Sequence, residues 1–256
     1  MLVNLQTTHR PQTLRAAQAL LSMPGNYPIY GSGGYLFRME NALRRDVQAA
    51  VDLSELVSNM VKRYPNDQLF ISGAATLQAV SETVHRGAEV IKGEFPATLR
   101  NTLTIGDLLM ELPSNSLSLA LLYGLGAQID TPRTGEDDLI ELGRWFGLSV
   151  QERRQHIVQG VVIWKYAEPW RFAVAKVSRT PADAPIVGAL GFAYAGETNP
   201  GSYAVVVGVE PHPVRYHSGL VATVEDYKGS AAYRTEMARI LSEQAIEAAE
   251  HLARQG

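Results

Sequence analysis

Apolar segments of strand length and of helix length follow one another along this sequence without a regular strand–helix–strand repeat. Apolar residues spaced three or four positions apart predict helices over residues 13–21, 77–85, 117–125 and 183–189, and from about Ser230 to the end. Runs rich in β-branched and aromatic residues predict strands over residues 29–30, 49–53, 68–73, 127–130, 157–166, 172–177, 190–195 and 203–209. An extended stretch is expected over residues 100–106, and a short helix or turn over 139–145. This irregular order is typical of the α+β class.

Two domains are predicted, covering residues 1–167 and 168–256, because the pattern of segments changes at Glu168-Pro169. The second domain would end in a long helix with one apolar stripe, formed by Tyr233, Met237, Ile240, Leu241, Ala245, Ala248 and Leu252. We interpret this stripe as core packing, and contact with a partner subunit is the alternative.

The composition excludes several classes of chemistry. The chain has no cysteine, which excludes disulfides, thiolate catalysis and cysteine-ligated iron–sulfur clusters. A redox centre would therefore be an organic cofactor or would lie on a partner chain. The histidines are never four residues apart, no stripe of lysine and arginine indicates nucleic acid, and no long apolar run predicts a membrane span. The N-terminus lacks a signal-peptide pattern, so we expect a cytoplasmic protein.

Two glycine-bearing turns, Ser32-Gly33-Gly34 and Thr104-Ile105-Gly106, each follow a short extended segment. Glycine permits positive φ and has no Cβ, so several backbone N–H groups can converge on one anion. The diphosphate of a dinucleotide cofactor would suit such a cradle; a tight hairpin and a strand end are the alternatives for the two turns. The segment 124–129 resembles a truncated Rossmann fingerprint, but it lacks the third glycine and follows a predicted helix, so we do not interpret it as a dinucleotide-binding motif.

Eight segments in order along the chain carry a family pattern, namely residues 10–17, 32–36, 51–56, 71–76, 100–106, 172–179, 183–189 and 230–234. Among them, Arg100-Asn101-Thr102-Leu103-Thr104-Ile105-Gly106 is close to an Arg-Asn-x-x-Thr-Ile-Gly-Gly loop, and Ser230-Ala231-Ala232-Tyr233-Arg234 to a Ser-Ala-x-Tyr-Arg motif. On these segments the chain resembles the FAD-binding medium subunit of molybdenum hydroxylases, the xanthine dehydrogenase and carbon monoxide dehydrogenase family.

The resemblance implies an FAD-binding fold of the vanillyl-alcohol oxidase type, made of two α+β subdomains, followed by a small α/β domain like that of carbon monoxide dehydrogenase flavoproteins. It also implies an oxidoreductase subunit that is inactive alone. Such a subunit passes electrons from an iron–sulfur subunit to NAD, a quinone or dioxygen, while a molybdopterin subunit oxidises the substrate. No catalytic residue is nominated in this chain. The residues implied to contact FAD are Ser32, Gly33, Gly34, Tyr35, Leu36, Gly73, Ala74, Thr76, Asn101, Thr104, Ile105, Gly106, Asp107, Asn115 and Lys176.

The sequence departs from the family pattern at both glycine turns. Tyr35-Leu36 replaces the usual Thr-Asp, and Asp107 replaces the second glycine of the second turn. A carboxylate about 5 Å from a diphosphate would weaken binding by roughly 3 kcal/mol at an effective dielectric of about 20, or about two decades of affinity. That cost vanishes if Asp107 points to solvent or if the alignment slips by one residue.

Three functions are therefore open. The first is the electron-transfer flavoprotein subunit. The second is a scaffold or binding protein that keeps the fold and has lost FAD. The third is a stand-alone flavin oxidoreductase, for which no substrate acid or base can be nominated. Asn115 or Ser116 could form an uncharged hydrogen bond to the edge of the flavin. Lys176 and Arg179 could contact the flavin, or they could be ordinary charged residues of an edge strand.

Overall fold

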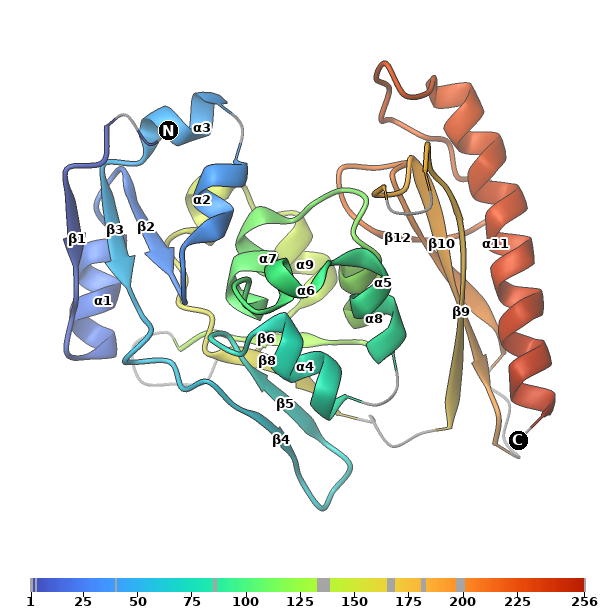
Figure 1. Cartoon of the computed structure of the whole chain (residues 1–256), viewed down its shortest axis with the longest axis horizontal. Coiled ribbons are helices and arrows are strands. Elements are labelled where there is room, and N and C mark those ends of the chain that lie inside the picture. The colour runs from blue at the N-terminus through green and yellow to red at the C-terminus, as the bar shows by residue number, and fades with distance from the viewer. Residues whose placement is uncertain are drawn as a thin grey trace. The chain divides into compact units, whose positions relative to one another are not determined.

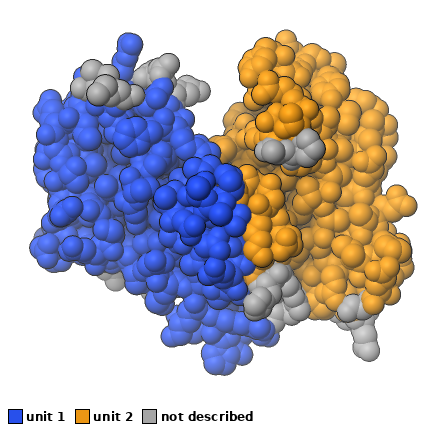
Figure 2. Space-filling view, viewed as in Figure 1, with its two compact units in different colours: residues 1–83, 96–111, 127–164 blue, residues 84–95, 112–126, 165–256 orange. Residues whose placement is uncertain are grey.

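The computed structural model describes residues 2, 4–39, 41–84, 87–132, 139–164, 169–180, 183–196 and 201–255 (Figure 1). The chain forms two compact units (Figure 2). Unit 1 contains residues 1–83, 96–111 and 127–164, and unit 2 contains residues 84–95, 112–126 and 165–256. The domain boundary predicted at residues 167 and 168 lies outside the described residues, and the two units are described separately below.

Unit 1 begins with a small parallel sheet of three strands in the order β1-β3-β2. Its strands are β1 (Thr7–His9), β2 (Asn26–Ile29) and β3 (Ala49–Asp52). Helix α1 (Leu14–Leu21) connects β1 to β2 and begins at Thr13, whose hydroxyl accepts the N–H of Ala16 at 3.1 Å. Two short helices, α2 (Gly34–Arg38) and α3 (Asn41–Asp46), lie between β2 and β3.

The second sheet of unit 1 is antiparallel, with five strands in the order β4-β5-β8-β6-β7. Its strands are β4 (Val61–Arg63), β5 (Leu69–Ser72), β6 (Gln128–Asp130), β7 (Leu139–Glu141) and β8 (Gly160–Ile163). The helices of this part are α4 (Leu77–Thr83), α6 (Ala97–Arg100), α7 (Ile105–Glu111), α9 (Leu142–Phe146) and α10 (Val150–Arg153). Trp145 is fully buried and its indole N–H donates to the carbonyl of Leu109 at 2.9 Å, which fixes α9 to α7.

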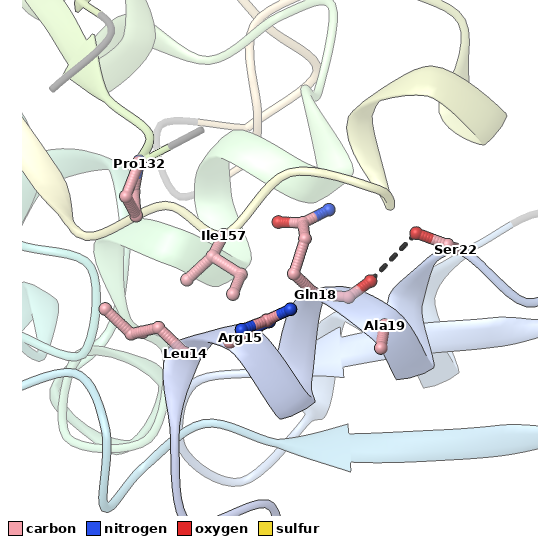
Figure 3. Close-up of a pocket in the computed structure, with 7 residues that line it drawn as sticks. All are labelled: Leu14, Arg15, Gln18, Ala19, Ser22, Pro132 and Ile157. Carbon is pink, nitrogen blue, oxygen red and sulfur yellow. Dashed lines mark hydrogen bonds between the residues drawn. The ribbon is translucent and has the colours of Figure 1, made fainter. Parts of the chain in front are cut away.

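A cavity of about 610 Å³ lies beside α1 (Figure 3). Helix α1 buries Ala17 and Leu21 in the core of unit 1. A second stripe of the same helix, with Leu14 and Gln18 one turn apart, lines the cavity, and Pro132 and Ile157 line it from other parts of the unit.

Unit 2 is an antiparallel sheet of four strands covered by helices on both faces. The strand order is β12-β11-β10-β9, with bounds β9 (Trp170–Val177), β10 (Val187–Tyr194), β11 (Tyr203–Val207) and β12 (Val214–Arg215). Helix α11 (Ala231–Arg254) packs on one face, where Ala238, Leu241 and Ala245 are buried. Helices α5 (Ala88–Glu94) and α8 (Leu117–Gly124) contribute Val90 and Leu121 to the core on the other face.

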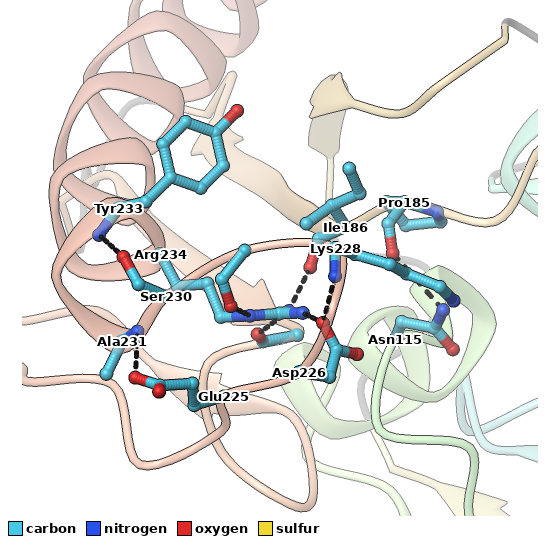
Figure 4. Close-up of polar contacts among 12 residues, drawn as sticks. Asn115, Pro185, Ile186, Glu225, Asp226, Lys228, Ser230, Ala231, Tyr233 and Arg234 are labelled. Carbon is cyan, nitrogen blue, oxygen red and sulfur yellow. Dashed lines mark hydrogen bonds and ion pairs between the residues drawn. The ribbon is translucent and has the colours of Figure 1, made fainter.

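Arg234 ties the start of α11 to the rest of unit 2 (Figure 4). Its side chain is 3% exposed and pairs with Asp226 at 2.6 Å. The guanidinium also donates to three backbone carbonyls, those of Gly229 at 3.1 Å, Ile186 at 2.7 Å and Gly208 at 2.7 Å. Ser230 caps the same helix by accepting the N–H of Tyr233 at 3.3 Å. The Ser-Ala-x-Tyr-Arg motif of the sequence is thus a structural anchor here.

Most of the predicted elements are confirmed, two predictions are wrong, and the short helix or turn predicted over 139–145 is found only from Leu142, because residues 139–141 form β7. Residues 100–106 do not form an extended stretch, because α6 ends at Arg100 and α7 begins at Ile105, leaving one bridge between Thr104 and Thr76. The helix predicted over 183–189 is not found in the described part of that range, where β10 begins at Val187. The apolar stripe of the last helix packs in the core through Leu241 and Ala245, whereas Tyr233 and Leu252 are exposed.

Candidate functional site: two adjoining glycine turns

The two predicted glycine turns lie side by side within unit 1, although they are far apart in the sequence. The hydroxyl of Ser32 donates to the carbonyl of Thr102 at 3.1 Å. A Cβ atom built on Gly31 would lie 3.0 Å from the side chain of Thr104. The structure therefore brings the residues of both turns together, as a site made of both would require.

The first turn keeps free hydrogen-bond donors. Gly33 has φ of +66°, a left-handed conformation that favours glycine, and it precedes α2. Within the described part of the chain, the N–H groups of Ser32, Gly33, Gly34 and Tyr35 donate to no other atom. Ser32 is exposed and Gly34 is half-buried, whereas Gly33 and Tyr35 are buried, so an anion from solvent could approach this turn at Ser32 and Gly34.

Tyr35 and Leu36, which replace the usual Thr-Asp, both point into the core. Tyr35 is 1% exposed and its hydroxyl donates to the carbonyl of Pro28 at 2.6 Å. Burial, together with the nearby carboxyl of Asp107, raises the pKa of Tyr35 well above its usual value. The Tyr35 hydroxyl is therefore already used to hold α2 against β2.

The second turn uses its donors internally. The N–H of Ile105 donates to the carbonyl of Ala75 at 3.0 Å, and the N–H of Gly106 donates to the carbonyl of Gly73 at 2.8 Å. A Cβ on Gly106 would lie 2.4 Å from the ring of Tyr30, so glycine is needed here for packing. The side of Gly106 on which a Cβ would lie is therefore filled by protein atoms and offers no open cradle for an anion.

Asp107 and Thr104 cap helix α7 reciprocally. The N–H of Thr104 donates to the Asp107 carboxylate at 3.0 Å, and the N–H of Asp107 donates to the Thr104 hydroxyl at 3.1 Å. Asp107 is 0% exposed, so it does not point to solvent. Its other carboxylate oxygen has no hydrogen-bond partner in the described part of the chain.

The pKa of Asp107 is raised to about 6, mainly because burial disfavours the charged carboxylate. The hydrogen bonds from Thr104 and the positive charge of Arg38 act in the opposite direction. Arg38 itself pairs with Glu111 at 2.9 Å. At neutral pH the second turn therefore carries a buried negative charge that is only partly compensated.

The segment 73–76 supports the second turn. The N–H of Gly73 donates to the carbonyl of Gln159 at 2.8 Å, and a Cβ on Gly73 would lie 2.2 Å from the carbonyl oxygen of Val158. Ala74 is buried, and Thr76 is half-buried and bridges to Thr104. Asn101 is exposed at the end of α6.

Tyr30 organises this region, although the sequence carries no signal for it. It is 1% exposed, and its hydroxyl accepts the N–H of Val158 at 2.7 Å. Burial raises the pKa of Tyr30 above its usual range. Its ring lies against Gly106 and within 3.5 Å of the Cβ position of Gly73. It therefore packs the second turn against the segment between α10 and β8.

The last two predicted contacts, Asn115 and Lys176, belong to unit 2. The Asn115 amide donates to the carbonyl of Pro185 at 3.2 Å (Figure 4). Lys176 lies on β9, opposite Gly188 of β10. Their part in flavin binding stays a prediction.

The fit of FAD to these residues differs between the two turns. The first turn offers N–H groups that donate to no other described atom, at the exposed Ser32 and the half-buried Gly34 as well as at two buried residues. The second turn offers none from Ile105 or Gly106, and it adds a buried carboxylate. Among the described residues no group of three histidine, aspartate or glutamate side chains could hold a metal ion. None of the described helices has the length and apolarity needed to cross a bilayer.

No protein-family model matches the sequence, and no curated protein matches it either. Solved structures are similar along almost the whole chain. The carbon monoxide dehydrogenase from Hydrogenophaga pseudoflava, in a form that lacks the Mo-pyranopterin moiety of the molybdenum cofactor, contains a chain that is 18% identical, with a TM-score of 0.79. The match covers 96% of this chain and 98% of that chain.

Two further structures agree with this likeness. Quinoline 2-oxidoreductase from Pseudomonas putida 86 is 17% identical over 97% of this chain and 98% of that chain, with a TM-score of 0.79. Reconstituted carbon monoxide dehydrogenase from Oligotropha carboxidovorans is 17% identical over 96% and 98% of the two chains, with a TM-score of 0.77. The fold expected from the family resemblance is thereby confirmed: this chain has the fold of a chain found in each of these enzymes.

Proposed function

We propose that this chain is the flavoprotein-type subunit of a multi-subunit oxidoreductase of the molybdenum hydroxylase kind, and that it binds FAD at the first glycine turn. The observation that carries the proposal is the set of unused N–H groups at residues 32–35, on a fold shared with chains of carbon monoxide dehydrogenase and quinoline 2-oxidoreductase. When bound, FAD would supply electron transfer to NAD, a quinone or dioxygen. The partners would be an iron–sulfur subunit and a molybdopterin subunit.

The role of the protein residues would be to bind and orient. The N–H groups of Gly33 and Gly34 would hold the diphosphate, and Gly34 has no side chain, whereas a Cβ at that position would already contact Leu103 and Ser32 at 3.4 Å. Asp107 would oppose the diphosphate through its charge. We therefore expect FAD to exchange with solvent instead of remaining bound through purification.

A second candidate is a cofactor-free structural subunit of the same kind of complex. The observation that favours it is the buried second turn, whose N–H groups at Ile105, Gly106 and Asp107 are all engaged within the protein. In that case the fold would serve only to dock the partner subunits.

Calorimetric titration of the purified chain with FAD separates the two candidates. Saturable one-to-one binding is expected, and Asp107→Asn should strengthen it roughly tenfold to a hundredfold, because the charge is removed while the side chain can still accept the Thr104 N–H. Gly34→Val should abolish binding by covering the turn. Valine at Gly34 requires no left-handed backbone, because the φ of this residue is not positive.

Circular dichroism of each variant would check that the fold is kept. If the wild-type chain and Asp107→Asn both fail to bind FAD at any concentration, the cofactor-free candidate is correct. If both variants bind FAD as the wild type does, the diphosphate is not held at these turns.

A further inference from the structure

The cavity beside α1 is separate from the glycine turns and has a chemistry of its own. Its walls include the aliphatic side chains of Leu14, Ala19, Pro132 and Ile157, and no aromatic ring is found among the described residues that line it (Figure 3). Its volume of about 610 Å³ falls within the range of small-molecule sites. The walls therefore suit a flexible aliphatic chain better than a flat ring.

Arg15 supplies the only charge among the described lining residues, and it is exposed. Its guanidinium makes no hydrogen bond or ion pair within the described part of the chain. The other polar groups of the wall are already engaged. The Gln18 amide donates to the carbonyl of Gln155 at 2.6 Å, and the Ser22 hydroxyl donates to the carbonyl of Gln18 at 2.9 Å. Arg15 is thus the group left to bind a ligand's charge.

We propose that this cavity binds a medium-chain aliphatic carboxylate. The carboxylate would accept hydrogen bonds from the Arg15 guanidinium, a fork of donors that matches its two oxygens. The hydrocarbon chain would lie between Leu14 and Ala19 on α1 and Ile157 on the opposite wall. The proposed site includes no residue of either glycine turn, so the proposal does not depend on whether the chain binds FAD.

The direct test is calorimetric titration of the full chain with decanoate, below the concentration at which decanoate forms micelles. We expect saturable binding of one decanoate per chain. Octanoate should bind roughly tenfold more weakly, because two methylene groups are lost from the apolar contact. Arg15→Gln should weaken decanoate binding about three- to tenfold, as expected for a charge-assisted hydrogen bond at an exposed rim.

Two tryptophan substitutions on α1 provide a matched pair. Ala19→Trp places a large ring in the cavity and should abolish decanoate binding. Ala16 lies on the same helix, is also exposed and is not among the described residues that line the cavity, so Ala16→Trp should leave binding unchanged. Both positions face outward from the core, and thermal melting by circular dichroism would check that both variants fold.

Absence of saturable decanoate binding would overturn the proposal. Equal loss of binding in Ala19→Trp and Ala16→Trp would also overturn it, since the ligand would then bind elsewhere on the helix. If Arg15→Gln bound decanoate as tightly as the wild type does, Arg15 would not recognise the carboxylate. The proposal would then fail, because the cavity would bind amphiphiles without selecting their charge.

Discussion

Replacing Arg234 with methionine should lower the free energy of unfolding of the protein by roughly 3–5 kcal/mol, because three backbone carbonyls lose the buried donor that they bind, at about 1–3 kcal/mol for each unsatisfied buried group. The Arg234 side chain is 3% exposed, and its loss leaves three backbone carbonyls without their donor. Methionine keeps most of the volume, so the effect reports the lost hydrogen bonds. Urea denaturation followed by circular dichroism would measure it.

Arg239 offers a matched control on the same helix. It pairs with Glu236 at 2.7 Å and Glu243 at 3.0 Å, but its side chain is 48% exposed. Arg239→Met should therefore change the free energy of unfolding far less than Arg234→Met does, because exposed ion pairs contribute little to stability. Equal effects of the two substitutions would mean that the carbonyl contacts of Arg234 contribute little and that the motif around Ser230 has another purpose.

The last helix was predictable because every local signal agreed. Ser230 is a favoured N-cap residue, and it accepts the N–H of Tyr233 as such a cap should. The apolar stripe places Leu241 and Ala245 against the sheet of unit 2. What the sequence could not indicate is that Arg234, four residues after the cap, is buried, because its partners Ile186 and Gly208 lie far away in the chain.

The two wrong predictions have physical causes. Strand β10 is covered on both faces, by α11 and by α8, so residues 187–193 are all buried and show no alternation of polar and apolar side chains. Such a run cannot be distinguished from a helix by periodicity. Around Thr104, the sequence Thr-x-x-Asp resembles a capping box and could have predicted the start of α7.

The candidate site was predictable in its parts but not in its geometry. The glycine turns and the unusual Asp107 are visible in the sequence. The direction of the Asp107 side chain is not, because it depends on how α7 packs beside Tyr30 and Tyr35. The carboxylate does not reach solvent. It caps α7 at the position where the family pattern has a second glycine, and the turn is thereby closed by a buried side chain.

The pH dependence of stability should change sharply when Asp107 is replaced with asparagine. The pKa of Asp107 is raised from 3.8 to about 6 in the folded protein. Between these pH values the folded state holds a proton that the unfolded state has released, so stability falls as the pH rises through this window and levels off above it. A shift of about two pH units corresponds to roughly 3 kcal/mol.

Asparagine cannot ionise, and its side-chain oxygen can still accept the N–H of Thr104. The difference in the free energy of unfolding between Asp107→Asn and the wild type should therefore shift in favour of the variant by roughly 3 kcal/mol between about pH 3.5 and pH 7. Any constant cost of burying the amide cancels from this comparison. Urea denaturation of both proteins at several pH values would measure the shift.

Asp226 provides a control of opposite sign. Its pKa is lowered in the folded protein, chiefly by the hydrogen bond from the backbone N–H of Lys228 and also by its bond and ion pair with Arg234. The ionised Asp226 therefore stabilises the folded protein at neutral pH, and this stabilisation is lost as the pH falls. The free energy of unfolding of Asp226→Asn should accordingly fall further below that of the wild type as the pH rises. If Asp107→Asn behaved like Asp226→Asn, the carboxylate of Asp107 would be stabilised by its surroundings. The argument that its buried charge opposes a diphosphate at the adjoining turn would then fail.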